Sequence, residues 1–521
     1  MNHSTTIPAS WQAKRGTMTT RKVGKLYSPF LTFLYQKKAN RILGCVALTA
    51  GIVQLIIFKT LYPFPDFMVD SYNYIGTASL HLPVNIWPVG YGKFLALIHQ
   101  ISHSDLLIIA IQYFLLEAAL SYLFFTILYL YRPGKKTRTL LFLFFFFNPL
   151  FLYVSNCILS DAIFAALSIL FLVQFLWMLH KPALSQVIIQ GVIIGMAFTV
   201  RYTALYYPLV TVAGLLLSRH QPAVKAWGSV LGIGLIIPFV LVTQQKTKEL
   251  TGTGQFSVFG GWQIANNALY MYSHIIVDST LLPKETLALN GLATQFFKTV
   301  PDSQRNLAVF QGSFFIAAPY APLQRYMGQE NAVNETGDQF KAWAKVSPVY
   351  SAFGQSLIAR HPLAYSRYFL WPNLKKYFQP SLEKFESYNM GMNTVPTNVQ
   401  DWFGYITPDV LAVSSTFQGA LFFLYPSLFL VLNLYFLGMM VWLLGSRRFR
   451  ILPARFWKAT IILSIFLGLN AGFSILAEPV VLRYQIVPMI VLFTFSLLFL
   501  DFMDRKKQQK INTNQRLTAA I

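Results

Sequence analysis

Residues 106–130 read LLIIAIQYFLLEAALSYLFFTILYL, an apolar run with a single charged residue, Glu117. As a helix this run would be roughly 38 Å long, enough to cross a hydrocarbon core of about 30 Å. Comparable runs recur along the chain, in which 55% of the 521 residues are hydrophobic and 12% are charged. This composition excludes an ordinary soluble protein and predicts an all-α polytopic membrane protein.

We expect about 10–12 transmembrane helices, of which ten can be assigned to the sequence. The ten expected spans are 42–62, 106–130, 139–155, 159–179, 186–200, 202–218, 226–243, 416–444, 459–477 and 484–500. They divide the chain into a basic arm (1–41), an N-terminal transmembrane block (42–244), an insert (245–415), a C-terminal transmembrane block (416–500) and a basic tail (501–521). The insert is long enough for a small folded domain, for which we expect mixed structure.

The distribution of charge predicts the orientation in the membrane. The arm, the tail and alternate loops between the spans hold 25 of the 42 Lys and Arg residues and only two acidic residues, which accounts for the whole formal charge of +23. Basic flanks stay on the cytoplasmic side, so both termini are expected there, in the plasma (inner) membrane. The insert and the first large loop, residues 63–104, are then expected outside.

The same charge pattern excludes some other classes of protein. A pI near 9.8 can indicate nucleic-acid binding, but here the basic excess follows the membrane topology and favours anionic membrane lipid. Two cysteines, Cys45 and Cys157, provide neither a disulfide framework nor a Cys-rich zinc site. A GxxxxGK[ST] phosphate-binding loop is also missing from the sequence.

The loop at 63–104 places two carboxylates, Asp66 and Asp70, about one helical turn apart just beyond the first span. Apolar residues recur at helical spacing in both halves of this loop, so we expect two short amphipathic helices lying on the bilayer. Asp70 is our preferred general base and Asp66 the second choice. Either could instead be the N-cap of the helix that follows.

Further ionisable residues lie at the same expected ends of other spans, where they are costly unless paired, buried in a cavity or functional. These are Asp161, Arg201, Glu478 and Arg483, with Tyr484 beside the last. A carboxylate that accepts a proton and an Arg that neutralises a phosphate suit transfer from a phosphate leaving group. The alternatives are that Asp161 caps a helix, that Arg201 snorkels to lipid phosphate, and that Arg483 pairs with Glu478 to fix a hairpin.

Four stretches resemble the membrane glycosyltransferases of the GT-C superfold, in particular bacterial protein mannosyltransferases and lipid A aminoarabinose transferases. They are Asp66 and Asp70-Ser71-x-x-Tyr74-Ile75 with Pro88-x-Gly90-Tyr91, Leu159-Ser160-Asp161-x-x-Phe164, Gly195-x-Ala197-x-x-x-Arg201-Tyr202, and Glu478 with Arg483-Tyr484 and Pro488. These stretches occur in the order of the family and cover most of the transmembrane portion, but not 245–415.

The resemblance implies inverting sugar transfer from a dolichyl- or undecaprenyl-phosphate sugar to an extracytoplasmic glycan, lipid or protein. It implies the first-loop Asp as the catalytic base, with the second acidic position and Arg483-Tyr484 around the donor phosphate. Our full prediction has Asp70, Asp66 and Asp161 as catalytic candidates, Arg201, Arg483 and Tyr484 as donor-phosphate ligands, and Tyr74, Tyr91 and Glu478 as supporting residues. A divalent cation held with phosphate oxygens is permitted but not required. The alternatives are a transporter or flippase of a lipid-linked glycan and a non-catalytic polytopic assembly protein.

Overall fold

A computed structural model describes residues 29–301, 313–332, 338–446 and 452–518. The chain divides into two compact units at residues 46 and 47. The first contains α1 (Pro29–Gln36) and the start of α2 (Lys38–Leu61). All features of the site lie in the second unit, and the arrangement described below is its own.

The described residues contain eight helical segments that are long and apolar enough to cross a membrane. They are α2, α5 (Asp105–Tyr131), α6 (Lys135–Phe146) with α7 (Pro149–Asn156), α8 (Asp161–His180), α11 (Pro222–Gly234) with α12 (Ile237–Thr251), α22 (Phe417–Phe422) with α23 (Tyr425–Gly445), α24 (Ala454–Ala477), and η8 (Leu482–Gln485) with α25 (Ile486–Thr518). Two shorter apolar helical segments are α9 (Leu184–Val200) and η1 (Tyr202–Tyr206) with α10 (Tyr207–Leu217). Each of the ten expected spans thus corresponds to a helical segment, and the protein is an all-α, multi-pass membrane protein.

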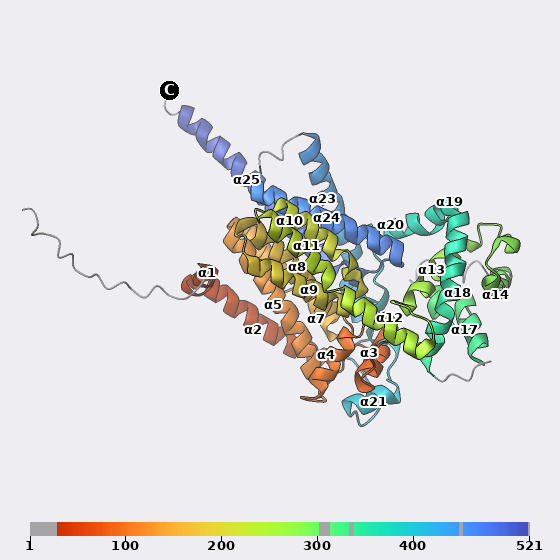
Figure 1. The fold of residues 1–521 in the computed structure, drawn as a ribbon. Helices are drawn as coiled ribbons and strands as arrows, with labels where there is room; N and C mark the ends of the chain where they lie inside the picture. Colours follow the sequence, from red (N-terminus) through yellow and green to blue (C-terminus); the bar gives the residue numbers. More distant parts are fainter. Residues whose placement is uncertain (1–28, 302–312, 333–337, 447–451, 519–521) are drawn as a thin grey trace, which may run out of the picture. The chain divides into compact units, whose positions relative to one another are not determined.

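The loop at 63–104 contains two helices, α3 (Val69–Ser79) and α4 (Gly90–His99), as its apolar spacing predicted. They pack against each other, and α4 also contacts α9 and α5 (Figure 1). Gly92 of α4 allows this close packing, because a Cβ atom there would lie 2.6 Å from the Thr77 side chain of α3. The loop is therefore a folded part of the protein rather than a tether.

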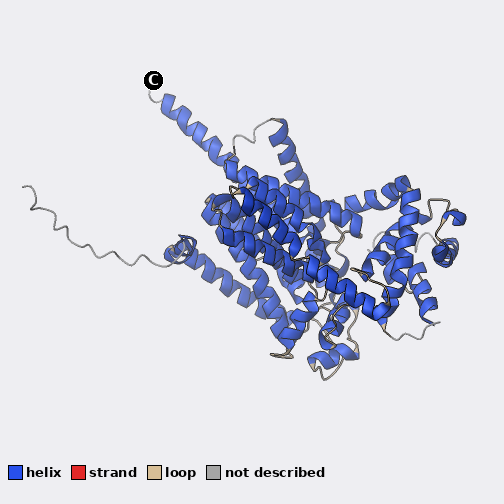
Figure 2. Ribbon diagram, in the orientation of Figure 1, coloured by secondary structure: helices blue, strands red, loops and turns tan. Residues whose placement is uncertain are grey.

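The insert is helical in its described parts, as Figure 2 shows. Its elements are α13 (Val258–Tyr272), η2 (Ser279–Leu281), η3 (Lys284–Thr286), α14 (Leu287–Thr299), α16 (Phe314–Ala317), α17 (Pro322–Ala332), α18 (Gln339–Arg360), α19 (Pro362–Tyr365), η4 (Ser366–Leu370), α20 (Trp371–Phe378), η5 (Glu383–Phe385), η6 (Tyr388–Gly391) and α21 (Thr397–Phe403). The described residues include isolated β-bridges but no strand, so the mixed structure expected for this region is not found there. Sequence patterns could not decide this, because the insert lacks the long apolar runs that identify the membrane helices.

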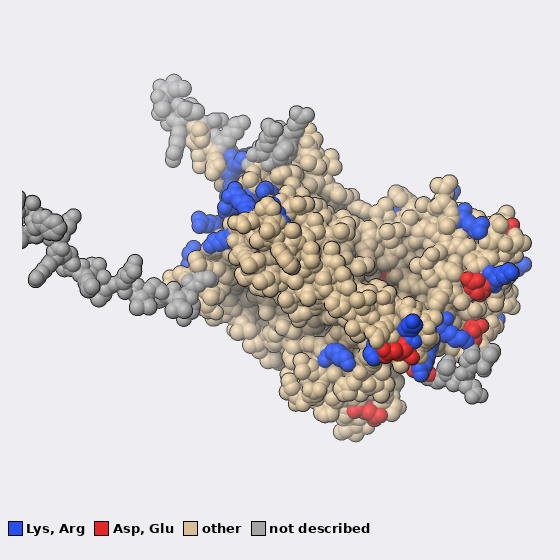
Figure 3. Space-filling view, in the orientation of Figure 1, with Lys and Arg blue, Asp and Glu red and all other residues tan. Residues whose placement is uncertain are grey.

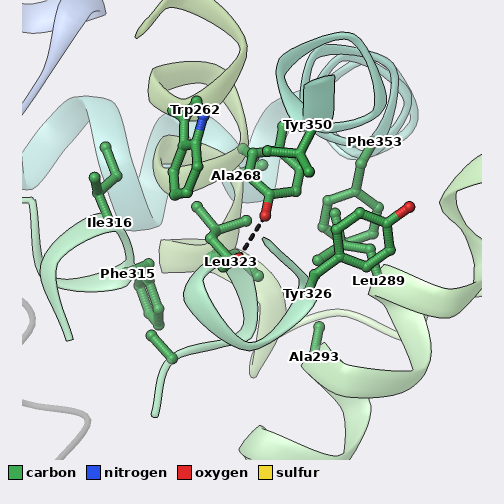
Figure 4. Close-up of a cluster of buried hydrophobic side chains, with 14 of the residues drawn as sticks. Trp262, Ala268, Leu289, Ala293, Phe315, Ile316, Leu323, Tyr326, Tyr350 and Phe353 are labelled. Atoms are coloured by element: carbon green, nitrogen blue, oxygen red, sulfur yellow. Dashed lines mark hydrogen bonds between the residues drawn. The ribbon is translucent and has the colours of Figure 1, made fainter. Parts of the chain in front are cut away.

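A hydrophobic core of its own holds the insert together (Figure 4). Trp262 and Tyr350, from α13 and α18, are fully buried, and the Tyr350 hydroxyl donates a hydrogen bond to the Leu323 carbonyl. The two helices approach closely at Gly261, where a Cβ atom would lie 2.0 Å from the Ser347 carbonyl oxygen. Val84 of the 63–104 loop joins this core, which fixes the insert against the loop that carries Asp70.

Charged side chains are distributed unevenly over the described surface. In Figure 3, Lys and Arg side chains gather near the end of the helix bundle from which α25 emerges, whereas both signs of charge are mixed over the insert. Exposed basic residues at or beside the helix ends there include Lys135 and Lys136 at the start of α6, Lys181 and Arg219. The structure itself contains no membrane, so the side on which this basic end lies remains a prediction.

Candidate active site

Several helix ends meet on the side of the bundle that faces the 63–104 loop. α8 begins at Asp161, with an acidic residue in its first turn, where the helix dipole favours negative charge. α9 ends at Val200, and Arg201 follows in extended conformation before η1. Pro479 follows the end of α24, and the chain then turns through η8 into α25. These interruptions bring charged side chains from distant parts of the sequence into one cluster.

Asp70 lies in the first turn of α3, and the N-cap of that helix is Met68. The hydroxyl of Ser71 accepts a hydrogen bond from the Met68 backbone N–H at 2.9 Å, and the start of the helix has no side-chain cap, so Asp70 does not cap it. Asp161 is likewise the first residue after an N-cap, Ser160, rather than the cap itself. The alternative that these two carboxylates serve only as N-caps is therefore wrong.

The central feature of the site is a network of ion pairs around Arg483. One guanidinium nitrogen lies 3.5 Å from Asp161 and the other lies 3.5 Å from Asp70, while Asp161 also binds Arg201. Lys384, from the insert, lies 3.1 Å from the same oxygen of Asp70. Arg483 is only 9% exposed and Asp161 only 4%, so these pairs are shielded from solvent. The network brings together the preferred base and both predicted arginines.

Tyr484 completes the cationic part of the network. Its hydroxyl accepts a hydrogen bond from Arg483 at 2.8 Å, and its ring lies 4.6 Å from the Arg483 guanidinium and 5.0 Å from that of Arg201. An aromatic face stabilises a desolvated guanidinium. Arg201 pairs with Asp161, so it does not extend to lipid phosphate as the simpler alternative had it. Arg483 pairs with Asp70, Asp161 and Glu383 instead of the expected Glu478.

An open pocket lies beside this network and encloses about 630 Å³, including the part open to solvent. Its charged lining residues are Asp161, Arg201, Glu478 and Arg483, and Tyr484, whose ring lies against both arginines, lines it as well. Aromatic and aliphatic side chains, including Phe466 and Phe473 of α24, line most of the rest, together with the polar residues Thr203, Asn470 and Ser474. Because the α24 lining runs from Phe466 to Ala477, the pocket follows that helix for roughly 17 Å. It therefore combines a charged region with a long apolar wall.

The environments of the acidic groups differ in ways that affect their protonation. Burial alone would raise the pKa of Asp70, but the positive charges of Lys384 and Arg483 lower it below its ordinary value. Burial raises the pKa of Glu478, against the opposing effects of a hydrogen bond from Tyr484 and the charge of Arg483. Asp70 is therefore ionised at neutral pH, as a general base must be.

Asp66, the second candidate base, lies outside this network. Its side chain is buried and accepts a hydrogen bond from the Asn389 backbone N–H at 3.0 Å, and its own backbone forms a parallel bridge with Cys157. Burial raises the pKa of Asp66 to about 7, although the bond from Asn389 opposes this shift. These contacts give Asp66 a structural role in holding the insert against the first loop.

The predicted supporting tyrosines lie behind the network rather than in it. Tyr74 forms a hydrogen bond of 3.1 Å with Ser160, directly before Asp161, and its ring packs edge-on against Tyr91. Tyr91 donates a hydrogen bond of 2.5 Å to Gln112, which in turn donates to the Cys157 carbonyl. This chain of contacts fixes the start of α8 and thereby the position of Asp161.

Two asparagines of the insert fix the end of α24. The Asn373 side chain donates to the Ile475 and Glu478 carbonyls at 2.8 Å each and accepts from the Val480 N–H at 2.8 Å. Asn267 donates to the Ala477 carbonyl, also at 2.8 Å. These bonds satisfy carbonyls that a helix end leaves free, and they orient the segment that carries Glu478 and Arg483.

Sequence reasoning missed Glu383, Lys384, Asn373 and Asn389, all of which belong to the insert. Lys384 and Asp70 are 314 positions apart, and no spacing or motif in the sequence connects them. A single signal was present: the Glu383-Lys384 pair occurs soon after the aromatic segment 371–378, where the chain returns towards the bundle.

In the part of the chain that the structure describes, no group of three or more His, Cys, Asp or Glu side chains is arranged to hold a metal ion. The carboxylates of the network instead face Arg and Lys side chains. Comparisons with protein-family models, curated proteins and solved structures found no match to this chain. The class of the protein therefore has to be argued from the site itself.

Proposed function

We propose that this protein is an integral-membrane glycosyltransferase that transfers a sugar from a polyprenyl-phosphate donor to an acceptor hydroxyl, with inversion of configuration. The observation that carries this proposal is a pocket with a largely apolar wall and two guanidinium groups at its charged part, with an ionised carboxylate on the far side of Arg483. Few ligands need both features. A phosphate on a long hydrocarbon chain is one of them.

The donor phosphate belongs beside Arg201 and Arg483 in this proposal. Both guanidinium groups line the charged part of the pocket, and Tyr484 lies against both. Guanidinium groups bind phosphate through parallel hydrogen bonds, and they retain their charge under all physiological conditions. The polyprenyl chain would follow the apolar wall that includes Phe466 and Phe473.

Asp70 is the general base in this proposal. Its carboxylate takes the proton of the acceptor hydroxyl while the acceptor oxygen forms a bond to the anomeric carbon of the sugar. The bond from that carbon to the phosphate oxygen breaks, and its electron pair leaves with the phosphate, which gains one negative charge. Arg201 and Arg483 stabilise this developing charge. Attack from the side opposite the leaving phosphate inverts the anomeric configuration.

The basic excess at the other end of the bundle supports an arrangement in the plasma (inner) membrane with cytoplasmic termini and a site on the outer side. Cysteine labelling in intact cells tests this orientation. In a chain in which the exposed Cys45 is replaced by Ser, Glu285→Cys in the insert should react with an impermeant maleimide, and Lys136→Cys should not. The reverse pattern would move the site to the cytoplasmic side.

The activity test uses purified protein in lipid nanodiscs with defined polyprenyl-phosphate sugars and a panel of glycan, lipid and peptide acceptors. Mass spectrometry should detect the glycosylated acceptor and free polyprenyl phosphate in equal amounts. Asp105→Asn is the matched control for Asp70→Asn, because Asp105 borders the same loop as Asp70 but binds Tyr405 instead of the arginines. Movement of a lipid-linked sugar across the membrane without any transfer would favour the flippase alternative and contradict the proposal.

A further inference from the structure

The segment from Ser381 to Met392 crosses the site and is attached to it at several points. Ser381 forms a parallel bridge with Val481, just before Arg483. The Tyr388 hydroxyl donates to the Pro65 carbonyl at 3.0 Å, and the Asn389 N–H donates to Asp66. We call this segment the strap. Its attachments connect the insert both to the loop of Asp70 and to the turn of Arg483.

The strap adopts an unfavourable backbone conformation near the network. Glu383, Asn389 and Met390 all have positive φ angles, of 50°, 48° and 53°, although none of them is a glycine. Residues other than glycine keep such conformations when the surrounding structure holds them there, and these cases cluster at functional sites. Glu383 also has a buried carboxylate oxygen without a hydrogen-bond partner, 3.8 Å from Arg483. The strap therefore places Glu383 beside Arg483 and Lys384 beside Asp70 in spite of an unfavourable backbone conformation.

Lys384 and Arg483 contact the same oxygen of Asp70, at 3.1 Å and 3.5 Å. The guanidinium groups that would bind a phosphate are already paired with carboxylates, Arg201 with Asp161 and Arg483 with Asp161 and Asp70. An incoming phosphate would thus compete with carboxylates for these cations. Lys384 is the most adaptable of the three, because an ammonium group on a flexible four-carbon stem can change partners without the orientation that a guanidinium requires.

We propose that Lys384 is a further donor-binding residue, which exchanges its ion pair with Asp70 for one with the phosphate of the lipid-linked donor. This inference rests on the proposed function. In the free protein Lys384 neutralises Asp70, and after donor binding it holds the phosphate together with Arg483. The exchange leaves the Asp70 carboxylate with one positive neighbour fewer, so it becomes a stronger base only when a donor is present. The expected consequence is that the donor binds before the acceptor reacts.

The binding of polyprenyl phosphate, the leaving group itself, tests this exchange without any measurement of sugar transfer. Its affinity is measured for the full-length protein in nanodiscs, with neutral polyprenol and inorganic phosphate as reference ligands. Lys384→Gln should weaken the binding of polyprenyl phosphate roughly tenfold or more, because a charge-assisted hydrogen bond is lost. Lys384→Arg should restore most of the affinity. Lys93→Gln is the matched control, since Lys93 lies in the 63–104 loop and donates only to the His81 carbonyl.

Asp70→Asn provides the second and sharper measurement. Because this substitution removes the carboxylate with which the phosphate competes, it should tighten the binding of polyprenyl phosphate about threefold to tenfold, the scale of a partly shielded ion pair. The gain should shrink in the double variant Asp70→Asn/Lys384→Gln, because Asp70 then releases Arg483 but no longer Lys384. The single variant Asp70→Asn keeps Lys384, so its affinity tests the exchange even if Lys384→Gln does not fold.

The outcomes separate this inference from the proposed function. If the wild type binds polyprenyl phosphate no better than polyprenol, the donor class of the proposed function is wrong. If it binds polyprenyl phosphate selectively, but Lys384→Gln behaves like Lys93→Gln or Asp70→Asn gives no gain, the exchange is wrong and the donor class stands. Equal competition by inorganic phosphate and polyprenyl phosphate would show that the site recognises phosphate without its lipid, which would contradict a lipid-linked donor.

Discussion

Asp66 and Asp70 lie four residues apart in one loop, yet the fold gives them opposite environments. Asp66 is packed inside the protein, where it accepts a hydrogen bond from a backbone N–H, and burial raises its pKa to about 7. Asp70 faces Lys384 and Arg483, whose charges lower its pKa despite burial. One carboxylate holds the strap in place and the other faces the cations of the site. Residue type and spacing alone do not distinguish an anchor from a base.

The largest expected difference between these two residues is in sugar transfer. Asp70→Asn is nearly isosteric but cannot take a proton at neutral pH, so turnover should fall by roughly 10²–10⁴-fold. Expression, membrane insertion and binding of polyprenyl phosphate should persist. The measurement is the initial rate of product formation with saturating donor, compared with the wild type and Asp105→Asn. Near-normal turnover would remove Asp70 as the base and leave Asp161 as the next carboxylate to test.

The next largest effect is expected at Arg483, which contacts Asp70 and lines the pocket proposed to hold the donor phosphate. Arg483→Lys keeps the positive charge but cannot bridge Asp161 and Asp70 with two nitrogens, as Arg483 does. Turnover should fall roughly 10²-fold, the scale of losing one preorganised donor to a developing charge. Arg505→Lys, at the other end of the bundle, is the matched control. Equal activity of the two variants would show that charge alone is sufficient at Arg483.

The sequence predicted the membrane architecture well, because hydrophobic length and charge are local properties. Ten apolar runs and both short helices of the 63–104 loop correspond to helices in the structure. It also singled out Asp70, Asp161, Arg201 and Arg483, which the structure joins in one ion-pair network, since ionisable residues at the ends of apolar runs stand out. The different roles of Asp66 and Asp70, and the contribution of Lys384, depend on contacts across more than 300 positions. Such contacts come from the folding of the insert, whose sequence has no comparable periodic signal.

A smaller effect is expected when the anchor itself is removed. Asp66→Leu leaves the buried Asn389 N–H without its acceptor, which should cost about 1–3 kcal/mol of stability and loosen the strap. Because Lys384 would then be less well placed, we expect roughly a tenfold loss of polyprenyl-phosphate affinity, the scale of one charge-assisted hydrogen bond. Thermal unfolding and phosphate binding measure the two effects separately. Loss of stability with unchanged phosphate affinity would show that the strap does not position Lys384.

The smallest effect on activity, and the clearest contrast with Asp70, is expected for Asp66→Asn. Asn can still accept the hydrogen bond from Asn389 but has no titratable group, so turnover should change no more than a few-fold.

A folded-state pKa of about 7 means that the folded protein binds more protons than the unfolded chain, whose Asp pKa is near 4. The contribution of Asp66 to stability is therefore present below about pH 4 and is lost as the pH rises to about 7. From pH 5 to pH 8, the stability of the wild type should fall by roughly 2–3 kcal/mol relative to Asp66→Asn. Thermal unfolding of both proteins across this range measures the difference, and a constant difference at every pH would contradict the raised pKa of Asp66 in the folded protein.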